Sequence, residues 1–214
     1  MERKGNLMTY RPDIKVFDAT IRDGGLVNSF FFTDEFVKAL YLANLRAGVD
    51  YMEMGYLADT DVFKVEDFGD WKFCKEASLR RIVGNNDTDM KLSVMADVGR
   101  TNLHRDLLPK EESVIDMVRV ATYINTMPAA IEMIEYAHSL GYETTCNIMA
   151  ISKANTSDIE EALALLAESH VDAVYIVDSY GSLFPEQIQR LTKLYLSAME
   201  PAGKLVGIHA HNNQ

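Results

Sequence analysis

The sequence predicts an α/β protein built from parallel β/α units, as a (β/α)8 TIM-type barrel truncated after strand seven. Seven short, almost continuously apolar runs alternate with longer segments of helical period, which is typical of buried parallel strands and their connecting helices. The chain has 214 residues, whereas a complete eight-unit barrel takes about 250. We therefore expect one domain over residues 1–214 that lacks its last β/α unit.

The predicted strands follow one another along the whole chain. Strand–helix–strand repetition gives right-handed parallel βαβ units, and the count of seven strands fits a barrel that lacks its last unit. An open doubly wound sheet is the structural alternative, but no glycine-rich phosphate loop follows the first strand. The seven expected strands are residues 14–21, 49–55, 91–98, 117–122, 142–150, 172–179 and 204–211.

Four of the intervening segments carry clear helix boundaries. Segment 33–48 has acids in its first turn and ends at a glycine, and segment 128–141 begins with proline and ends with glycine. Segment 157–170 opens with Ser157 and Glu160, which predict a capping box. Segment 185–199 begins with proline and repeats apolar residues at helical spacing. Segment 56–90 is the least regular and predicts one helix framed by loops.

The composition argues against several classes of partner. The formal net charge is -11, with 21 Lys and Arg against 32 Asp and Glu, so neither nucleic acid nor an anionic membrane is an expected partner. Only two cysteines occur, Cys74 and Cys146, and we expect both to be buried small residues in a reducing environment. No run approaches the roughly 18 apolar residues of a membrane span. A cytoplasmic protein is expected.

In a parallel barrel, functional side chains lie at the C-terminal ends of the strands. His209 and His211 occupy such an end, and positions i and i+2 of a strand face the same side. Together with one carboxylate they would form a two-histidine, one-carboxylate metal site. Otherwise, one histidine is a core residue and the other faces solvent. The other strand ends contribute Asp18, Thr20, Arg22, Asp23, Glu53, Asp97, Thr122, Asn147, Asp178, Ser179 and Asn212.

The stretch DATIRDGG, residues 18–25, is the second dense group of functional residues. Arg22 and Asp23 could form a plain surface ion pair. Here, however, they end a predicted buried strand, and two glycines follow that would let the backbone turn tightly toward a ligand. We expect Asp23 to bind the metal and Arg22 to donate to an anionic substrate oxygen.

FDATIRDGG and GIHAHNN, found at the first and seventh predicted strands, resemble the metal-dependent lyases and Claisen synthases built on TIM barrels. This superfamily includes 3-hydroxy-3-methylglutaryl-CoA (HMG-CoA) lyase, 2-isopropylmalate synthase and 4-hydroxy-2-oxovalerate aldolase. VRVAT (118–122) and VYIVDSYGSLFPEQI (174–188) are most similar to the 4-hydroxy-2-oxovalerate aldolases.

The resemblance implies a role for several residues. Asp23, His209 and His211 match the ligands of a divalent metal, usually Mn²⁺, with Mg²⁺, Zn²⁺ or Co²⁺ as alternatives. Arg22 matches the arginine that stabilises a pyruvate enolate. Ser179 matches a serine near the substrate carboxylate, and Glu53 matches an acid shared across the superfamily.

The implied activity is cleavage of a 4-hydroxy-2-oxo acid to pyruvate and an aldehyde through a metal-stabilised enolate. In the aldolases a catalytic histidine follows RDG after one intervening residue, and this chain has Leu26 at that position. Leucine carries no titratable group, so another base is required. Glu53, Asp97 and Tyr123 are the candidates, while Lys153 could serve only a metal-free Schiff-base reaction.

Two other functions remain open at this stage. One is an acetyl-CoA-dependent Claisen-type acyltransferase on the same metal site. The other is a non-catalytic barrel that binds metal and a 2-oxo acid, which Leu26 favours. The expected partners are a small 2-oxo acid and, by resemblance, a second copy of the chain or a dehydrogenase that takes the aldehyde.

Overall fold

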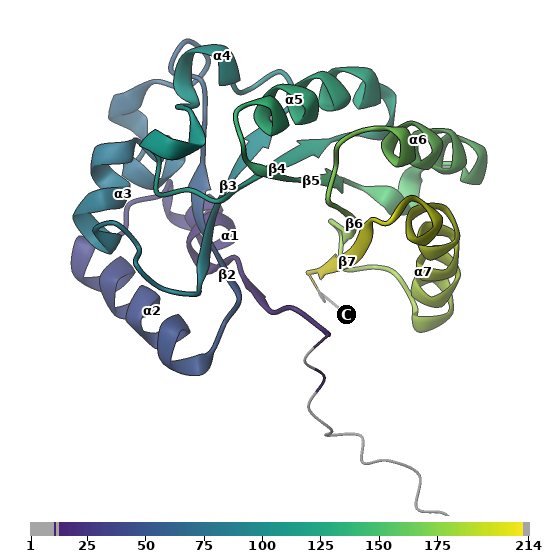
Figure 1. Cartoon of the computed structure of the whole chain (residues 1–214), viewed down its shortest axis with the longest axis horizontal. Coiled ribbons are helices and arrows are strands. Elements are labelled where there is room, and N and C mark those ends of the chain that lie inside the picture. Colours follow the sequence, from purple (N-terminus) through teal and green to yellow (C-terminus); the bar gives the residue numbers. More distant parts are fainter. Residues whose placement is uncertain (1–10, 12, 212–214) are drawn as a thin grey trace, which may run out of the picture.

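The computed structural model describes residue 11 and residues 13–211 (Figure 1). Asn212, which the sequence placed at the end of the seventh strand, lies outside the described residues. None of the helices in the described part of the chain is long and apolar enough to cross a membrane.

The seven predicted strands are confirmed as one parallel sheet in the order β1 to β7. Figure 1 shows this sheet as an open arc with helices on its outer side, and β1 and β7 lie on the two sides of the opening. Among the described residues, β7 pairs with β6 alone and β1 with β2 alone. The strands are β1 Phe17–Asp18, β2 Tyr51–Tyr56, β3 Lys91–Asp97, β4 Met117–Thr122, β5 Glu143–Ile148, β6 Ala173–Asp178 and β7 Leu205–Ala210.

The four predicted helices are also confirmed, and segment 56–90 contains the expected helix, α3. The helices are α1 Thr20–Asn28, α2 Asp34–Ala47, α3 Glu76–Val83, α4 Leu103–Asp106, α5 Met127–Ser139, α6 Thr156–Glu168 and α7 Pro185–Met199. Short 3-10 turns are η1 Val65–Asp67, η2 Asp70–Lys72, η3 Lys110–Glu112, η4 Ile124–Thr126, η5 Ile151–Lys153 and η6 Glu200–Ala202.

Helix α6 begins earlier than its sequence pattern predicts. Its N-cap is Asn155, so Ser157 already lies within the first turn and the predicted Ser157–Glu160 capping box is wrong. The Ser157 hydroxyl instead contacts the Asp158 carboxylate at 3.3 Å. By contrast, α2 has the expected boundaries: Thr33 accepts from the Phe36 amide, and Gly48 ends the helix in the left-handed conformation.

The first strand is much shorter than predicted, and this changes the setting of Arg22 and Asp23. Strand β1 ends at Asp18, and both residues lie in helix α1. The two glycines therefore do not form the tight turn expected from the sequence. A side chain at Gly25 would overlap the Phe30 ring, whose nearest atom would lie 2.1 Å from an added Cβ. Gly25 thus makes room for a buried aromatic ring beneath the helix.

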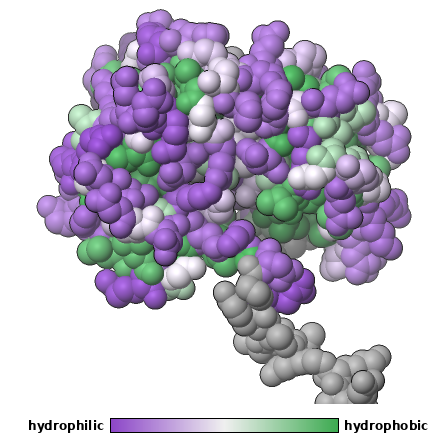
Figure 2. Space-filling view, in the orientation of Figure 1, coloured by the Kyte–Doolittle hydropathy of each residue, from purple (hydrophilic) through white to green (hydrophobic). Residues whose placement is uncertain are grey.

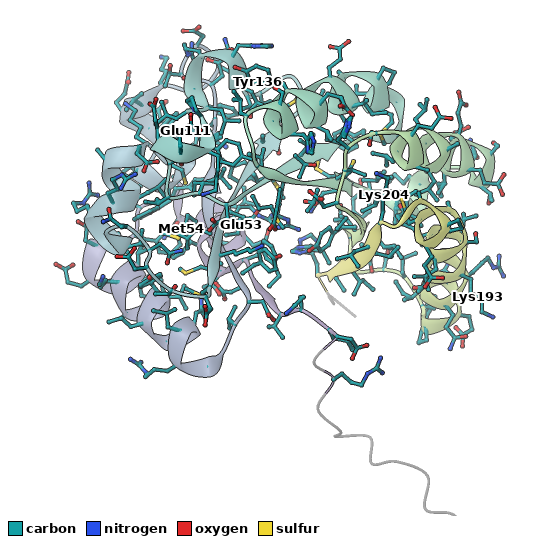
Figure 3. All side chains as sticks on the ribbon, in the orientation of Figure 1. Glu53, Met54, Glu111, Tyr136, Lys193 and Lys204 are labelled. Atoms are coloured by element: carbon teal, nitrogen blue, oxygen red, sulfur yellow. The ribbon has the colours of Figure 1, made fainter. Side chains whose placement is uncertain are left out.

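The main apolar core lies between the outer face of the sheet and the helices. Because successive residues of a strand face opposite sides, outward Met52 and Met54 pack in this core while Glu53 faces inward. Figure 3 shows Glu53 on the inner side of the arc. Figure 2 shows a mostly hydrophilic surface with separate apolar patches, and Leu205 and Ile208 on β7 are among the exposed apolar side chains.

A bulge in β2 adds a second inward-facing polar residue. Glu53 pairs with Ser93 and Tyr56 pairs with Met95, so β2 has one more residue than β3 over this stretch. Tyr56 consequently faces the same side as Glu53, although three residues separate them. Two polar side chains of one strand therefore reach the interior of the arc.

Gly207 on β7 leaves the space that the Tyr175 ring of β6 fills. A Cβ atom at position 207 would lie 2.5 Å from the Tyr175 ring. We expect Gly207→Val to destabilise the protein by about 1–3 kcal/mol, as overpacking usually does, measured by urea unfolding. An unfolding free energy equal to that of the unmodified protein would show that Tyr175 can move aside without cost.

Candidate metal centre

Three side chains from the two ends of the chain meet at the opening of the arc. One ligand atom each from Asp23, His209 and His211 lie within 4.8 Å of one another. His209 Nε2 is 3.0 Å from Asp23 Oδ2, and His211 Nε2 is 4.0 Å from Asp23 Oδ1. Helix α1 therefore presents the Asp23 carboxylate to the two histidines at the end of β7, although the sequence had placed Asp23 at the end of the first strand.

The hydrogen bond of His211 orients its ring toward this group. Its Nδ1 donates to the main-chain carbonyl of Asp178 at 3.0 Å. In a neutral ring Nε2 is then the nitrogen that can bind a metal, and it lies 3.4 Å from His209 Nε2. Metal-binding histidines characteristically have their second nitrogen fixed in this way. The three side chains therefore fit a divalent ion by donor type, proximity and ring orientation.

Asp23 is held in its ionised form. Burial opposes ionisation, but the hydrogen bond from His209 and the positive charge of Arg22 together lower the pKa of the Asp23 carboxyl below its usual value. The Arg22 guanidinium contacts the Asp23 carboxylate directly. A carboxylate in this state can act as a metal ligand.

Behind Arg22 lies a buried ion-pair network on the inner face of the sheet. Glu53 Oε2 accepts from Arg22 Nε at 2.8 Å and from Arg119 Nη1 at 2.7 Å. Glu53 is fully buried, and Arg119 is stacked between the rings of Phe17 and Tyr175, at 4.3 and 4.7 Å from their centroids. The network fixes the guanidinium of Arg22 next to the three-residue group.

Sequence reasoning missed Arg119, Tyr56 and Lys72. Arg119 could have been found as the one charged residue in an otherwise apolar predicted strand. Tyr56 faces inward only because of the β2 bulge, which has no clear sequence signal. Lys72 lies in the segment 56–90, whose path the sequence does not indicate.

The other predicted strand-end residues take separate places. The Ser179 hydroxyl accepts a hydrogen bond from the Ala150 amide at 2.9 Å, and the Asp178 carboxylate accepts from the amides of Ser182 and Leu183. Asn147 is buried, with no partner for its side-chain oxygen among the described residues. Leu26 is 62% exposed.

Two predictions about residues outside the site are also settled. Cys74 and Cys146 are buried as expected, and burial raises the pKa of both thiols, which disfavours a nucleophilic role. The Lys153 amine lies 4.5 Å from the ring centroid of Tyr180, and its hydrogen bond with the Tyr180 side chain raises its pKa. A Schiff-base lysine needs a lowered pKa, so Lys153 does not fit that role.

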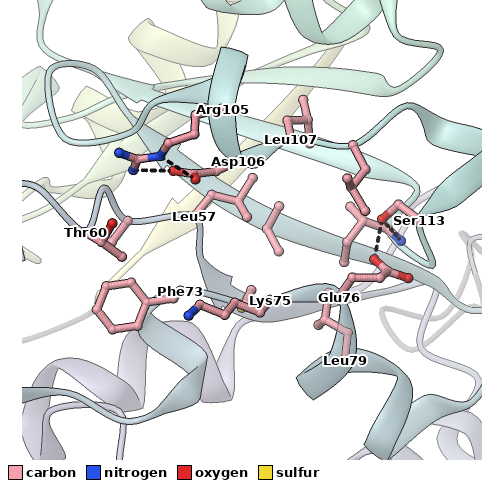
Figure 4. Close-up of a pocket in the computed structure, with 15 residues that line it drawn as sticks. Leu57, Thr60, Phe73, Lys75, Glu76, Leu79, Arg105, Asp106, Leu107 and Ser113 are labelled. Carbon is pink, nitrogen blue, oxygen red and sulfur yellow. Dashed lines mark hydrogen bonds and ion pairs between the residues drawn. The ribbon is translucent and has the colours of Figure 1, made fainter. Parts of the chain in front are cut away.

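A separate cavity of about 300 Å³ lies between the end of β2 and helices α3 and α4 (Figure 4). Leu57, Leu79 and Leu107 contribute apolar walls, and the charged Lys75 and Arg105 also line the cavity. None of the three candidate ligands lines this cavity. It is therefore distinct from the site at the opening of the arc.

Asp97 lies close to Arg22 and has a partly buried carboxyl. Burial raises its pKa, the cations Lys72, Arg100 and Arg22 lower it by smaller amounts, and Glu53 adds a further rise. Because the pKa of Asp97 is higher in the folded than in the unfolded state, the folded state becomes less stable as pH rises from about 3.9 through the raised pKa.

Asp97→Asn should abolish this pH-dependent loss of stability. We expect the free energy of unfolding of the variant, compared with that of the unmodified protein, to increase over that pH range in urea unfolding. A difference that does not vary with pH would contradict the raised pKa.

Known proteins resemble this chain over nearly its whole length. A family model described as HMGL-like matches residues 13–214. The 4-hydroxy-2-oxovalerate aldolase of Bacillus cereus is 24% identical over 200 residues, and that of Thermomicrobium roseum is 28% identical over 202 residues. These matches cover 94% and 93% of this chain but 57% and 54% of the relatives. The chain thus spans just over half the length of these curated relatives.

Solved structures support the fold. The N-terminal domain of a candidate aldolase from Bacteroides vulgatus superposes with a TM-score of 0.77 at 25% identity, covering 94% of this chain and 65% of that one. The HMG-CoA lyase of Brucella melitensis gives a TM-score of 0.65 at 14% identity, covering 91% and 71%. The seven β/α units therefore have the arrangement found in TIM barrels of this kind.

Proposed function

Because the chain belongs to the HMGL-like family, we propose that it is a metal-dependent aldehyde-lyase that cleaves a 4-hydroxy-2-oxo acid to pyruvate and an aldehyde. The observation that carries the proposal is the convergence of Asp23, His209 and His211 beside the buried Arg22 guanidinium. The names of the relatives, 4-hydroxy-2-oxovalerate aldolases at 24–28% identity, support the reaction class.

Asp23, His209 and His211 would hold the metal, for which we propose Mn²⁺. A carboxylate with two imidazoles suits a divalent ion of this type and leaves coordination positions open. When bound, the ion supplies a Lewis acid for the oxygens of the 2-oxo acid.

The role of Arg22 follows from its surroundings. Cleavage next to a carbonyl leaves an enolate, whose negative oxygen a fixed guanidinium stabilises. Two of the guanidinium nitrogens, Nε and Nη1, bind Glu53 and Asp23. An arginine has five N–H donors, so donors remain for a substrate oxygen. Glu53 and Arg119 hold the guanidinium in place before substrate binds.

Ser179 would contact the substrate carboxylate. Its oxygen accepts from the Ala150 amide, which leaves its hydroxyl proton available for donation. A hydroxyl in that state suits an anionic oxygen.

A second candidate function is a barrel that binds metal and a 2-oxo acid without turnover. The exposed Leu26, in the place where the resembling aldolases carry a histidine, favours it. The lyase requires a base elsewhere in the site.

The lyase is tested by incubating the metal-loaded protein with 4-hydroxy-2-oxo acids of increasing chain length. Pyruvate release is followed by coupling to lactate dehydrogenase. We expect cleavage that EDTA abolishes and Mn²⁺ restores. Absence of pyruvate with every divalent metal, despite measured binding of the 2-oxo acid, would contradict the lyase and support the non-catalytic barrel. Consumption of acetyl-CoA with a 2-oxo acid would instead indicate the Claisen-type reaction.

A further inference from the structure

We propose that Asp97 is the general base of this site and that the Lys72 ammonium, held nearby in a cage of aromatic rings, favours its charged form. The proposal rests on the lyase function proposed above. In the resembling aldolases a histidine is the base, and this chain has Leu26 in its place. The proposal names the residue that would act as the base instead, and it gives a role to a lysine that no sequence pattern indicated.

Lys72 is a buried cation inside a cage of aromatic rings. Its side chain comes from η2, directly above the end of β2, and only 7% of the residue is exposed. The amine lies 4.1 Å from the Phe63 centroid and 4.6 Å from that of Tyr56, and the rings of Phe30 and Phe68 complete the cage at 5.1 and 5.5 Å. Rings at these distances favour the charged ammonium, although burial lowers the pKa of Lys72.

The Lys72 amine has no hydrogen-bond acceptor among the residues that the structure describes. The negative charge of the nearby Asp97 raises the pKa of the amine and so favours its charged form. The ring faces around the ammonium offset part of the hydration that it loses in this position. Aromatic rings orient such a group without consuming its protons. Its N–H groups therefore remain available to the Asp97 carboxylate or to a ligand between them.

Asp97 faces the interior at the C-terminal end of β3. It pairs with Ala121 of β4, two positions beyond the Met95–Arg119 pair, so its side chain faces the same interior as Arg119. Its Oδ1 is buried and has no hydrogen-bond partner in the described part of the chain. Around it lie Lys72, Arg100 and Arg22 as cations, and Glu53 as an anion that opposes its ionisation. The Tyr56 phenol is also close enough for the Asp97 charge to raise its pKa.

The other candidate bases are less suitable. Glu53 is fully buried, and its Oε2 is already bound by both Arg22 and Arg119. Burial raises the pKa of the Tyr56 phenol to about 12, so it holds its proton near neutral pH. Tyr123 is 54% exposed and follows β4 on the far side of Asp97 from Arg22. Glu53 Oε1 is also without a partner among the described residues, but the Glu53 carboxylate is already shared by two guanidinium groups. Asp97 has an unbound Oδ1 and no such ion pair in the described part of the chain, so it is the better candidate.

In the proposed step, the Asp97 carboxylate takes the proton of the substrate C4 hydroxyl. The C3–C4 bond breaks, and its electron pair forms the C2–C3 double bond of an enolate whose negative charge lies on the C2 oxygen beside Arg22. The aldehyde leaves, and the proton on Asp97 passes to C3 to give pyruvate. The substrate is divided into two products with no gain or loss of atoms, and the carboxylate is regenerated.

The test compares Asp97→Asn and Lys72→Met with matched controls at exposed neighbours, Asp61→Asn and Lys75→Met. We expect Asp97→Asn to lower the rate of cleavage by about 10²–10⁴-fold, the usual contribution of a general base. Its metal content and pyruvate affinity should not change. Lys72→Met should retain activity but shift the acid limb of the pH–rate profile to higher pH, because the cation that favours the carboxylate is gone. Both controls should behave as the unmodified protein.

A second readout does not depend on activity. Carboxyl-carbon NMR of the metal-free protein should show one aspartate with a raised pKa that is absent in Asp97→Asn and rises further in Lys72→Met. If the unmodified protein lacks lyase activity, the proposed function fails, and this titration still decides whether the two residues interact. The proposal is overturned if Asp97→Asn cleaves at the normal rate, or if Lys72→Met leaves the aspartate titration unmoved. Reductive trapping of pyruvate on Lys72 by borohydride would also overturn it, because the amine would then be a nucleophile.

Discussion

His209→Ala is expected to remove most of the bound divalent metal, and His211→Ala should do the same. Each variant deletes one of the three candidate donors found in the described part of the chain. Nε2 of His209 lies 3.0 Å and Nε2 of His211 4.0 Å from the Asp23 carboxylate. Loss of a partner that merely orients a ligand costs roughly 10–100-fold in metal affinity, so loss of a ligand should cost more. Metal content after dialysis and Mn²⁺ titration calorimetry measure the effect.

His138→Ala is the matched control for both variants. His138 is an exposed residue of α5 that stacks on His170, and it takes no part in the candidate site. It should bind metal like the unmodified protein. Unchanged metal binding in His209→Ala and His211→Ala would refute the assignment of the ligands.

Glu53→Ala is expected to cause the largest loss of stability of any variant considered. It would leave Arg22 and Arg119 buried without their shared carboxylate. Breaking a buried ion pair from one side costs about 3–5 kcal/mol. Urea unfolding measures the loss, and circular dichroism establishes that the variant folds.

Glu111→Ala provides the comparison for Glu53→Ala. Glu111 is exposed in η3 (Figure 3), and a surface substitution of this kind changes stability by no more than about 0.5 kcal/mol. A Glu53→Ala loss as small as that of Glu111→Ala would mean that water reaches the two guanidinium groups. Arg119→Met, which leaves Glu53 bound to Arg22, should cost less than Glu53→Ala.

The regular parts of the fold could be predicted from the sequence because their signals are local. Apolar runs predicted all seven strands. Proline and glycine at the two ends predicted α5, and proline with the helical spacing of apolar residues predicted α7, both nearly to the residue. The i, i+2 spacing of His209 and His211 predicts that both face the same side, and the structure brings Asp23 to them.

The errors arose where tertiary contacts override local pattern. Residues 19–21 look like a strand, but the chain turns into α1 there, and Gly25 makes room for Phe30. The β2 bulge turns Tyr56 inward, and no single-residue signal marks it. The cage around Lys72 is assembled from rings that are separated by up to 38 residues in the chain, Phe30 and Phe68, so only the folded structure reveals it.

The most direct test of the proposed function is exchange of the pyruvate methyl protons in D₂O, followed by proton NMR. An enzyme that stabilises the pyruvate enolate should catalyse this exchange without any aldehyde present. We predict loss of the methyl signal with Mn²⁺-loaded protein, and little loss with His209→Ala or after EDTA treatment. No exchange with any divalent metal, in a sample whose binding of pyruvate has been measured, would contradict enolate chemistry at this site.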